Sequence, residues 1–210
     1  MSARVKVCGV TTVADALGCA DAGVDAVGIN FWSGSPRCVS RERGAEIAQA
    51  LRGKARSVAL FVDAGEDEIR STLAETGVEW VQLSGDEDPA LLKLFLPRAY
   101  KSVRLGSEAD VAKAVEFAGG EVLVDASVPG RKGGTGVLAD WDLAAKVARA
   151  RTTWLAGGLT PANVAEAVRK VQPFGVDVAS GVETTPGTKD LALVRAFVAA
   201  AKGAISRTTP

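Results

Sequence analysis

Short apolar runs and longer amphipathic segments alternate along the whole chain. Apolar runs of this length are typical of strands buried on both faces, and apolar positions spaced three and four apart indicate helices. The predicted strands are Val5–Cys8, Ala26–Asn30, Ser57–Val62, Trp80–Leu83, Lys101–Leu105, Val122–Asp125, Thr153–Ala156 and Val176–Ala179. The predicted helices are Val13–Ala22, Arg41–Leu51, Asp67–Thr76, Pro89–Phe95, Glu108–Phe117, Trp141–Ala150, Pro161–Val171 and Asp190–Ala201.

Eight strand–helix units predict a (β/α)₈ TIM barrel, and no change in composition divides residues 1–210, so we expect one domain. An open doubly wound sheet is the alternative, but the first strand is not followed by the GxGxxG turn of that fold. Gly23, Gly77 and Gly175 each precede a predicted strand and are expected to end a helix. Ser40 and Thr160 are the expected helix caps.

Composition excludes several function classes. The chain has 25 lysine and arginine residues and 25 aspartate and glutamate residues. We therefore expect no overall positive field that would bind nucleic acid or an anionic membrane surface nonspecifically. The chain has no histidine, and its three cysteines lack CxxC spacing, which argues against a metal site and against histidine-dependent nucleophilic catalysis. No apolar run approaches the ~18 residues of a membrane span, and we expect a cytoplasmic protein.

Two reactive side chains end predicted strands. Cys8 closes the first strand and Asp125 the sixth, so a barrel would direct both into one mouth. A thiolate can abstract a proton and a buried carboxylic acid can donate one, a combination suited to an isomerisation. The structural alternatives are a small buried cysteine and a turn-forming aspartate.

Glycine-rich loops follow three of the strands. After strand six, Gly133, Gly134 and Gly136 would give a loop the backbone freedom to close over a ligand. After strands seven and eight, the glycines and the nearby helix starts are typical of a phosphate site in this fold, although they could simply permit tight turns. The residues of this predicted phosphate site are Gly157, Gly158, Ser180 and Gly181.

The loop after the second strand contains Phe31, Trp32 and Arg37. The arginine fork could pair with a carboxylate and an aromatic ring could stack on the rest of an aromatic acid, unless Arg37 is simply solvated. Separately, alternation places Lys6 and Asp177 inside the barrel on strands one and eight, and we expect a structural ion pair between them.

These residues together resemble the phosphoribosylanthranilate isomerase family of tryptophan biosynthesis. The resemblance runs from end to end, through KVCGVTTVADA, DAVGINFWSGSPRCVS, VALFVDA, VQLSGDED, KSVRL, VLVDASVPGRKGGTG, LAGGLTPANVAEA and DVASGVETTPGTKD. It implies an Amadori rearrangement of N-(5-phosphoribosyl)anthranilate to 1-(2-carboxyphenylamino)-1-deoxyribulose 5-phosphate. Cys8 would be the general base and Asp125 the general acid. Arg37 would hold the anthranilate carboxylate, the glycine-rich loops would hold the phosphate, and no cofactor would be needed.

One position departs from the family pattern, since Ser84 stands where members usually have histidine. We expect this change to affect substrate positioning. Two other functions remain open at this stage: a related barrel acting on another aminoaldose phosphate, and a noncatalytic barrel that binds a phosphorylated ligand or a protein. We expect the protein to be a monomer or a homodimer.

Overall fold

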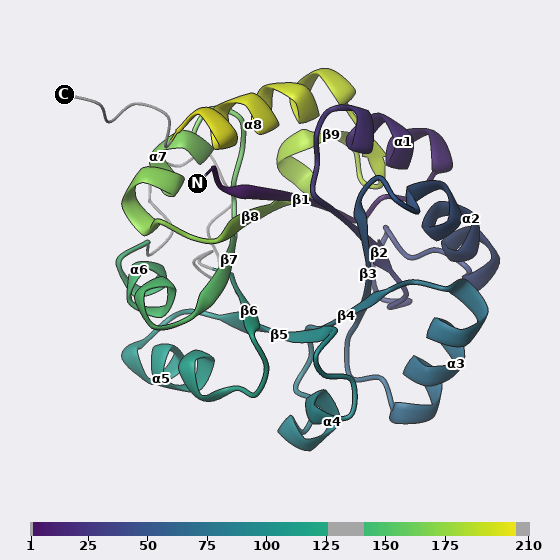
Figure 1. The fold of residues 1–210 in the computed structure, drawn as a ribbon, viewed down its shortest axis with the longest axis horizontal. Coiled ribbons are helices and arrows are strands. Elements are labelled where there is room, and N and C mark those ends of the chain that lie inside the picture. The colour runs from purple at the N-terminus through teal and green to yellow at the C-terminus, as the bar shows by residue number, and fades with distance from the viewer. Residues whose placement is uncertain (1, 126–140, 205–210) are drawn as a thin grey trace.

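The computed structural model describes residues 2–125 and 141–204, and these form a closed barrel surrounded by helices (Figure 1). Eight parallel strands pair in chain order, and β1 closes the ring by pairing with β8. The barrel strands are β1 (Arg4–Cys8), β2 (Ala26–Asn30), β3 (Arg56–Phe61), β4 (Trp80–Leu83), β5 (Ala99–Arg104), β6 (Glu121–Asp125), β7 (Thr152–Ala156) and β8 (Gly175–Val178). The predicted TIM barrel is confirmed.

Helices follow the strands and cover the outside of the barrel (Figure 1). They are α1 (Val13–Asp21), α2 (Arg41–Leu51), α3 (Glu66–Thr76), α4 (Pro89–Lys93), α5 (Glu108–Glu116), α6 (Trp141–Ala150), α7 (Val164–Val171) and α8 (Leu191–Gly203). After β8, a short 3₁₀ helix η1 (Ser180–Val182) leads into the two-stranded hairpin β9 (Glu183–Thr185) and β10 (Thr188–Lys189). This hairpin does not appear among the elements expected from periodicity.

Most predicted bounds agree with the structure to within one or two residues, but α7 differs. It begins at Val164, not at Pro161. The Asn163 side chain accepts a hydrogen bond from the Thr160 amide at 2.8 Å and donates one to the Gly158 carbonyl at 3.0 Å. These side-chain bonds to the backbone hold residues 161–163 in a turn, because they compete with the first helical turn. By contrast, Ser40 caps α2 as expected.

The apolar core has two parts. The larger cluster lies between the strands and the helices and includes Val27, Ile47 and Phe197. The smaller one fills the barrel interior, where Tyr100, Trp154 and Leu123 are buried together. The interior of the barrel is therefore filled by packed side chains below its mouth and is not an open pore.

The interior also contains the predicted ion pair. Lys6 and Asp177 are opposite each other in the register of β1 and β8, and Lys6 Nζ lies 2.9 Å from Asp177 Oδ1. The Lys6 side chain is fully buried. Burial alone would lower the pKa of Lys6, but the Asp177 carboxylate raises it above its ordinary value. The amine is therefore charged, and the barrel closes across an ion pair.

Two of the three glycines expected to end helices do so. Gly23 and Gly77 have φ of 86° and 66°, in the left-handed region that favours glycine. The expectation was wrong for Gly175, because α7 ends at Val171 and is capped by Gln172, with φ of 52°, whereas Gly175 lies in β8. A Cβ atom on Gly175 would lie 2.5 Å from the indole ring of Trp154, so this glycine makes room for the interior tryptophan.

We predict that Gly175→Ala lowers the free energy of unfolding by about 1–3 kcal/mol, since the added methyl group overpacks the ring of Trp154. Urea denaturation measures the change. Gly120→Ala is the matched control, because a Cβ atom there meets nothing within 4 Å, and it should stay within about 0.5 kcal/mol of wild type. Equal effects of the two substitutions would contradict the packing role assigned to Gly175.

Candidate active site

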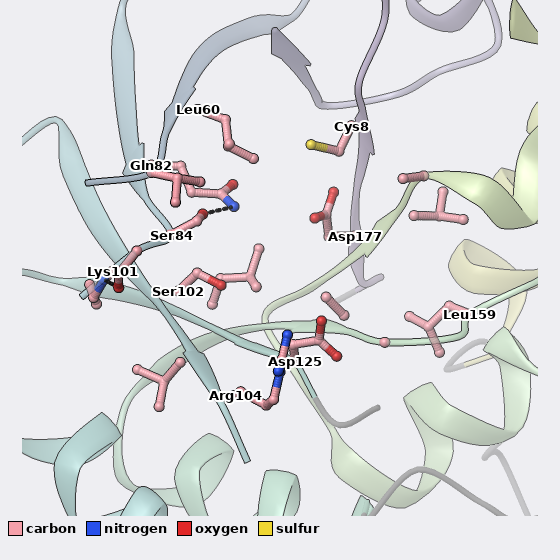
Figure 2. Close-up of a pocket in the computed structure, with 18 of the residues that line it drawn as sticks. Cys8, Leu60, Gln82, Ser84, Lys101, Ser102, Arg104, Asp125, Leu159 and Asp177 are labelled. Atoms are coloured by element: carbon pink, nitrogen blue, oxygen red, sulfur yellow. Dashed lines mark hydrogen bonds between the residues drawn. The ribbon is translucent and has the colours of Figure 1, made fainter. Parts of the chain in front are cut away.

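A cavity of about 780 Å³ opens at the carboxyl ends of the barrel strands. Its lining includes Cys8, Asp125 and Asp177, together with residues from the ends of most other strands. Figure 2 shows the side chains of these three residues facing the same space, with Gln82 and Ser84 on its other side. Residues distant in sequence therefore meet in one pocket because the barrel places all its strand ends on one face.

Cys8 is the last residue of β1, and its thiol is largely buried at the base of this cavity. Gly28 on the neighbouring strand makes space for it, since a Cβ atom there would lie 2.7 Å from Cys8 Sγ. Burial raises the pKa of the Cys8 thiol, while the ammonium groups of Lys6 and Lys189 act in the opposite direction. The Asp177 carboxylate adds to the effect of burial, so the pKa of the thiol is raised overall, and the two cations only reduce this shift.

Asp125 is the last residue of β6 and is partly buried. Its strand neighbours in register are Arg104 on β5 and Ala156 on β7, and all three residues line the cavity. The prediction that Asp125 and Cys8 face one mouth from separate strands agrees with this arrangement (Figure 2). The glycine-rich loop expected to close over a ligand, at residues 129–136, lies outside the described residues.

The loops after β7 and β8 form one rim of the cavity. The predicted phosphate-site residues Gly157, Gly158, Ser180 and Gly181 all line it. Gly157 and Gly158 have φ of 102° and 63°. A Cβ atom on Gly181 would lie 2.0 Å from the Leu159 carbonyl oxygen, so the two loops approach backbone to backbone. Such bare peptide groups can offer amide hydrogens to an anion.

Arg37 does not line the cavity, although it lies beside the end of β1. A Cβ atom on Gly9 would be 2.3 Å from Arg37 Cδ, so the arginine stem crosses directly over the residue after Cys8. The guanidinium already has a carboxylate partner within the chain. Arg37 Nε and Nη2 donate to Glu183 at 2.9 Å and 2.6 Å. Arg37 is therefore not simply solvated, and any ligand carboxylate would share its guanidinium with Glu183.

The two aromatic residues of the same loop have different surroundings. Phe31 stacks on Phe61 with ring centroids 5.8 Å apart, and it presses against Gly44 of α2. Its ring is therefore part of the packing between β3 and α2. Trp32 is 43% exposed and Phe31 is partly buried, so Trp32 is the more accessible of the two rings that could stack on a ligand.

Ser84 also lines the cavity. Gln82 Nε2 donates to Ser84 Oγ at 3.0 Å, and Tyr100 donates its hydroxyl hydrogen to Gln82 Oε1 at 3.1 Å. Below the same loop, the buried ammonium of Lys101 contacts the Gly85 carbonyl and the Glu87 carboxylate. Ser84 is thus linked through Gln82 to Tyr100 in the barrel interior.

Hydrophobic periodicity does not single out Glu183, Lys189 or Asn163, although all three shape the mouth. A buried charge gives no apolar signal, and its partner is visible only in three dimensions. One sequence signal does exist for the first two residues. They flank the Pro186–Gly187 turn at hairpin spacing, and Glu183 and Lys189 are opposite each other in the β9–β10 register.

The sequence model of the N-(5'-phosphoribosyl)anthranilate (PRA) isomerase family matches residues 5–200 of this chain. The chain belongs to the phosphoribosylanthranilate isomerase family. It is an isomerase of tryptophan biosynthesis. Relatives named N-(5'-phosphoribosyl)anthranilate isomerase include those of Magnetococcus marinus, 42% identical with 97% of each chain covered, and Myxococcus xanthus, 46% identical with 96% of this chain and 97% of the relative covered.

Solved phosphoribosylanthranilate isomerases share the fold closely. The enzyme from Thermotoga maritima has a TM-score of 0.87 at 36% identity, covering 96% of this chain and 99% of its own. A second structure, with a TM-score of 0.84 at 35% identity and the same coverage, is a complex with reduced 1-(o-carboxyphenylamino)-1-deoxyribulose 5-phosphate. A third, at 33% identity with a TM-score of 0.82, covers 96% of this chain and 99% of its own; it is described as monomers made from the dimeric Thermotoga maritima enzyme.

Within residues 2–125 and 141–204, no three histidine, cysteine, aspartate or glutamate side chains are grouped so that they could hold a metal ion. Among these same residues, no helix has the length and apolar character needed to cross a membrane.

We predict that Glu183 contributes to acid stability. Burial would raise the pKa of its carboxyl, but hydrogen bonds from Arg37 and Lys189 lower the pKa from 4.5 to about 2. A carboxyl with a lowered folded-state pKa stabilises the fold above its unfolded-state pKa, and this contribution is lost as the pH falls from 4.5 toward 2.

Glu183→Gln should therefore flatten the fall in unfolding free energy over this acid range, as measured by urea denaturation at a series of pH values. Glu66→Gln, at an exposed carboxylate paired with Arg70 on α3, should leave the acid profile unchanged. A wild-type acid profile in the Glu183 variant would show that its carboxyl is not held in the ionised form.

Proposed function

We propose that this chain catalyses the Amadori rearrangement of N-(5-phosphoribosyl)anthranilate to 1-(2-carboxyphenylamino)-1-deoxyribulose 5-phosphate, with Cys8 as general base and Asp125 as general acid. The observation that carries the proposal is the shared cavity, which both groups line from the ends of β1 and β6. The ligand described for a solved relative is a reduced form of this product. Family membership supports the reaction class, and the shared cavity supports the two proposed roles.

The reaction needs two proton transfers at different atoms. Asp125 donates a proton to the furanose ring oxygen, the bond from this oxygen to the anomeric carbon breaks, and a protonated Schiff base forms. The Cys8 thiolate then removes the proton from carbon two. The electron pair of that C–H bond forms a double bond between carbons one and two, and the π pair of the C=N bond moves onto the nitrogen, which gives a neutral enolamine. Tautomerisation of the enolamine gives the ketone. A proton donor and a proton acceptor on separate strands suit these two steps, because each group would face a different part of one sugar.

The ionisation of Cys8 is the critical requirement for the second transfer. Burial and the nearby Asp177 carboxylate raise the pKa of the thiol, which disfavours the thiolate. Lys6 lies two residues earlier on the same face of β1, and Lys189 donates to the carbonyl oxygen of Cys8 at 2.6 Å. These charges support the base role, since cations beside a thiol stabilise its ionised form.

The substrate's two anionic ends have separate places in this proposal. The backbone of Gly157, Gly158, Ser180 and Gly181 binds the phosphate, because their loops approach closely at one rim of the cavity. Arg37 binds the anthranilate carboxylate through guanidinium hydrogens that Glu183 does not occupy. The sugar is then held between the two ends, with its reacting atoms above Cys8 and Asp125.

We propose further that residues 1–210 act as one cytoplasmic domain on this small phosphorylated substrate, without a cofactor or metal, because the rearrangement is internally redox-neutral. Neither nucleic acid nor a membrane is a partner in this scheme. The assembly is a monomer or a homodimer, the latter being the state named for the Thermotoga maritima relative.

The reaction is tested by following the loss of fluorescence of the anthranilate adduct with purified protein. We predict that Cys8→Ala and Asp125→Asn each lower kcat by about 10²–10⁴-fold while the protein stays folded, since each removes one proton-transfer group. Circular dichroism and thermal unfolding check the fold. Cys19→Ala is the thiol control, because Cys19 is buried in α1 and does not line the cavity. A Cys8→Ala protein with wild-type turnover would overturn the assignment, and so would a wild-type protein that leaves the adduct unchanged.

At position 84 we predict that Ser84→His changes KM, whereas kcat stays within about threefold of wild type. The physical reason is that this side chain lines the cavity but neither proton-transfer group comes from β4. Steady-state kinetics on the same adduct separates the two constants. A tenfold or larger change in kcat would place position 84 in the chemical step.

A further inference from the structure

Three charged residues at the mouth form a continuous chain of ion pairs. The Glu183 carboxylate accepts from Arg37 Nε at 2.9 Å and from Arg37 Nη2 at 2.6 Å, and it accepts from Lys189 Nζ at 2.6 Å. The Glu183 and Lys189 side chains are 4% and 0% exposed, and that of Arg37 is 22% exposed. The chain therefore runs from a fully buried ammonium to a guanidinium at the surface of the mouth.

Lys189 connects this chain to the ends of two barrel strands. Its ammonium donates to the Cys8 carbonyl oxygen at 2.6 Å and approaches the Ala179 carbonyl oxygen at 3.5 Å. Cys8 ends β1, and Ala179 directly follows β8. The position of the Glu183 carboxylate is thus tied to the same backbone that holds the proposed catalytic thiol.

The hairpin that carries Glu183 and Lys189 is fastened to the first strand–helix loop. Thr11 Oγ1 donates to the Gly187 carbonyl at 2.8 Å, and the Lys189 amide donates to Asp15 Oδ2 at 3.3 Å. Figure 1 shows β9 beside α1, next to the end of β1. A carboxylate on this hairpin is therefore held by contacts on both of its sides.

The net charge of the three residues decides what they can bind. An isolated pair of Arg37 and Glu183 would be neutral and would offer little attraction to a second carboxylate. The buried Lys189 ammonium makes the cluster of three charges net positive. An incoming carboxylate therefore meets an arginine whose charge is not cancelled, even though one edge of its guanidinium is already used.

We propose that Glu183 is a positioning residue for substrate binding: it fixes the Arg37 guanidinium by the Nε–Nη2 edge so that the remaining N–H groups are presented to the substrate's aromatic carboxylate. This inference rests on the proposed function, in which Arg37 binds that carboxylate. Among the described residues, Arg37 Nη1 has no hydrogen-bond partner, which leaves its two N–H groups for the ligand. Fixing a flexible arginine beforehand removes part of the entropy cost of binding.

Glu183→Gln tests the proposal because it keeps the shape of the side chain and removes its charge. The substitution also makes the cluster more positive, which alone would strengthen binding of a carboxylate, so weaker binding reports the loss of positioning. We expect KM for the anthranilate adduct to rise roughly 10- to 100-fold, the factor that corresponds to one charge-assisted hydrogen bond that a displaced guanidinium no longer makes, while kcat stays within about threefold. Inhibition by anthranilate should weaken by a similar factor. Inhibition by inorganic phosphate, which probes the rim formed by the loops after β7 and β8, should be unchanged.

The matched control is Glu121→Gln. Glu121 also accepts two hydrogen bonds from an arginine, Arg56, at 3.1 Å and 3.0 Å, but it begins β6 at the other end of the barrel. This variant should keep the wild-type KM for the adduct. A rise in KM in both variants would mean that loss of any arginine-paired carboxylate charge loosens the whole barrel, and it would overturn the positioning role.

A double-mutant cycle shows whether Glu183 acts through Arg37. In an Arg37→Ala background, Glu183→Gln should change KM by less than about twofold, because no guanidinium is left to position. A full effect of Glu183→Gln in that background, or an equal loss of phosphate inhibition, would overturn the proposal and identify Glu183 as a general support of the hairpin.

The failure of this inference can be told apart from failure of the proposed function. A wild-type protein that does not consume the adduct defeats both. Wild-type turnover together with an unchanged KM in Glu183→Gln defeats the positioning role alone. If Glu183→Gln does not fold, Glu183→Asp keeps the charge and shortens the side chain by one methylene. It should raise KM with kcat maintained, and a wild-type KM in that variant would contradict the proposal.

Discussion

The ion pair between Lys6 and Asp177 lies where the two ends of the barrel meet. It joins β1 to β8 across the interior, with the Lys6 side chain fully buried. A buried charge that lost its partner would cost several kcal/mol, so any opening of the ring between these strands carries a large penalty. Because the ring is closed here, Cys8 on β1 lies beside the loop after β8, and the thiol and the glycine-rich rim belong to one cavity.

Near the ends of β1 and β8, the buried charges are arranged in groups that leave a local positive excess. Lys6 is balanced by Asp177, whereas Lys189 and Arg37 share Glu183. A chain with no net charge can therefore attract an anionic substrate, since only the local balance matters within a partly desolvated cavity. Burial and the Asp177 carboxylate raise the pKa of the Cys8 thiol, whereas Lys6 and Lys189 act in the opposite direction. Lys189 therefore takes part both in the positive cluster with Arg37 and in the electrostatic surroundings of the thiol.

The loops of the mouth are held mainly by side chains that bond to backbone. Asn163 fixes the turn after β7, Lys101 contacts the loop after β4, and Lys189 contacts the ends of β1 and β8. A loop that lacks an apolar core of its own needs such contacts to keep one conformation. The barrel fixes where strands end, and these polar residues fix where the peptide groups beyond the strand ends point.

Sequence periodicity located all eight strands because both faces of each strand are buried, and a buried strand must be apolar almost throughout. The (β/α)₈ order then placed Cys8, Asp125 and the two glycine-containing loops after strands seven and eight at one mouth. Alternation within β1 and β8 was also sufficient to predict the pair of Lys6 and Asp177. These inferences need only local patterns and the rule that parallel strand ends share one face.

Hydrophobic periodicity could not predict the contacts between residues that lie far apart in the sequence. Gly175 resembled a helix-ending glycine, yet its lack of a side chain serves Trp154 on the neighbouring strand. The start of α7 depends on bonds made by one asparagine, and the carboxylate partner of Arg37 lies 146 residues away along the chain. By itself, the sequence determined the barrel and the residue types at its mouth, because these follow from burial and spacing. Only the tertiary structure decided which charged residues of the loops are neighbours, because outside the regular strands an electrostatic partner is set by distance in space and not by spacing along the chain.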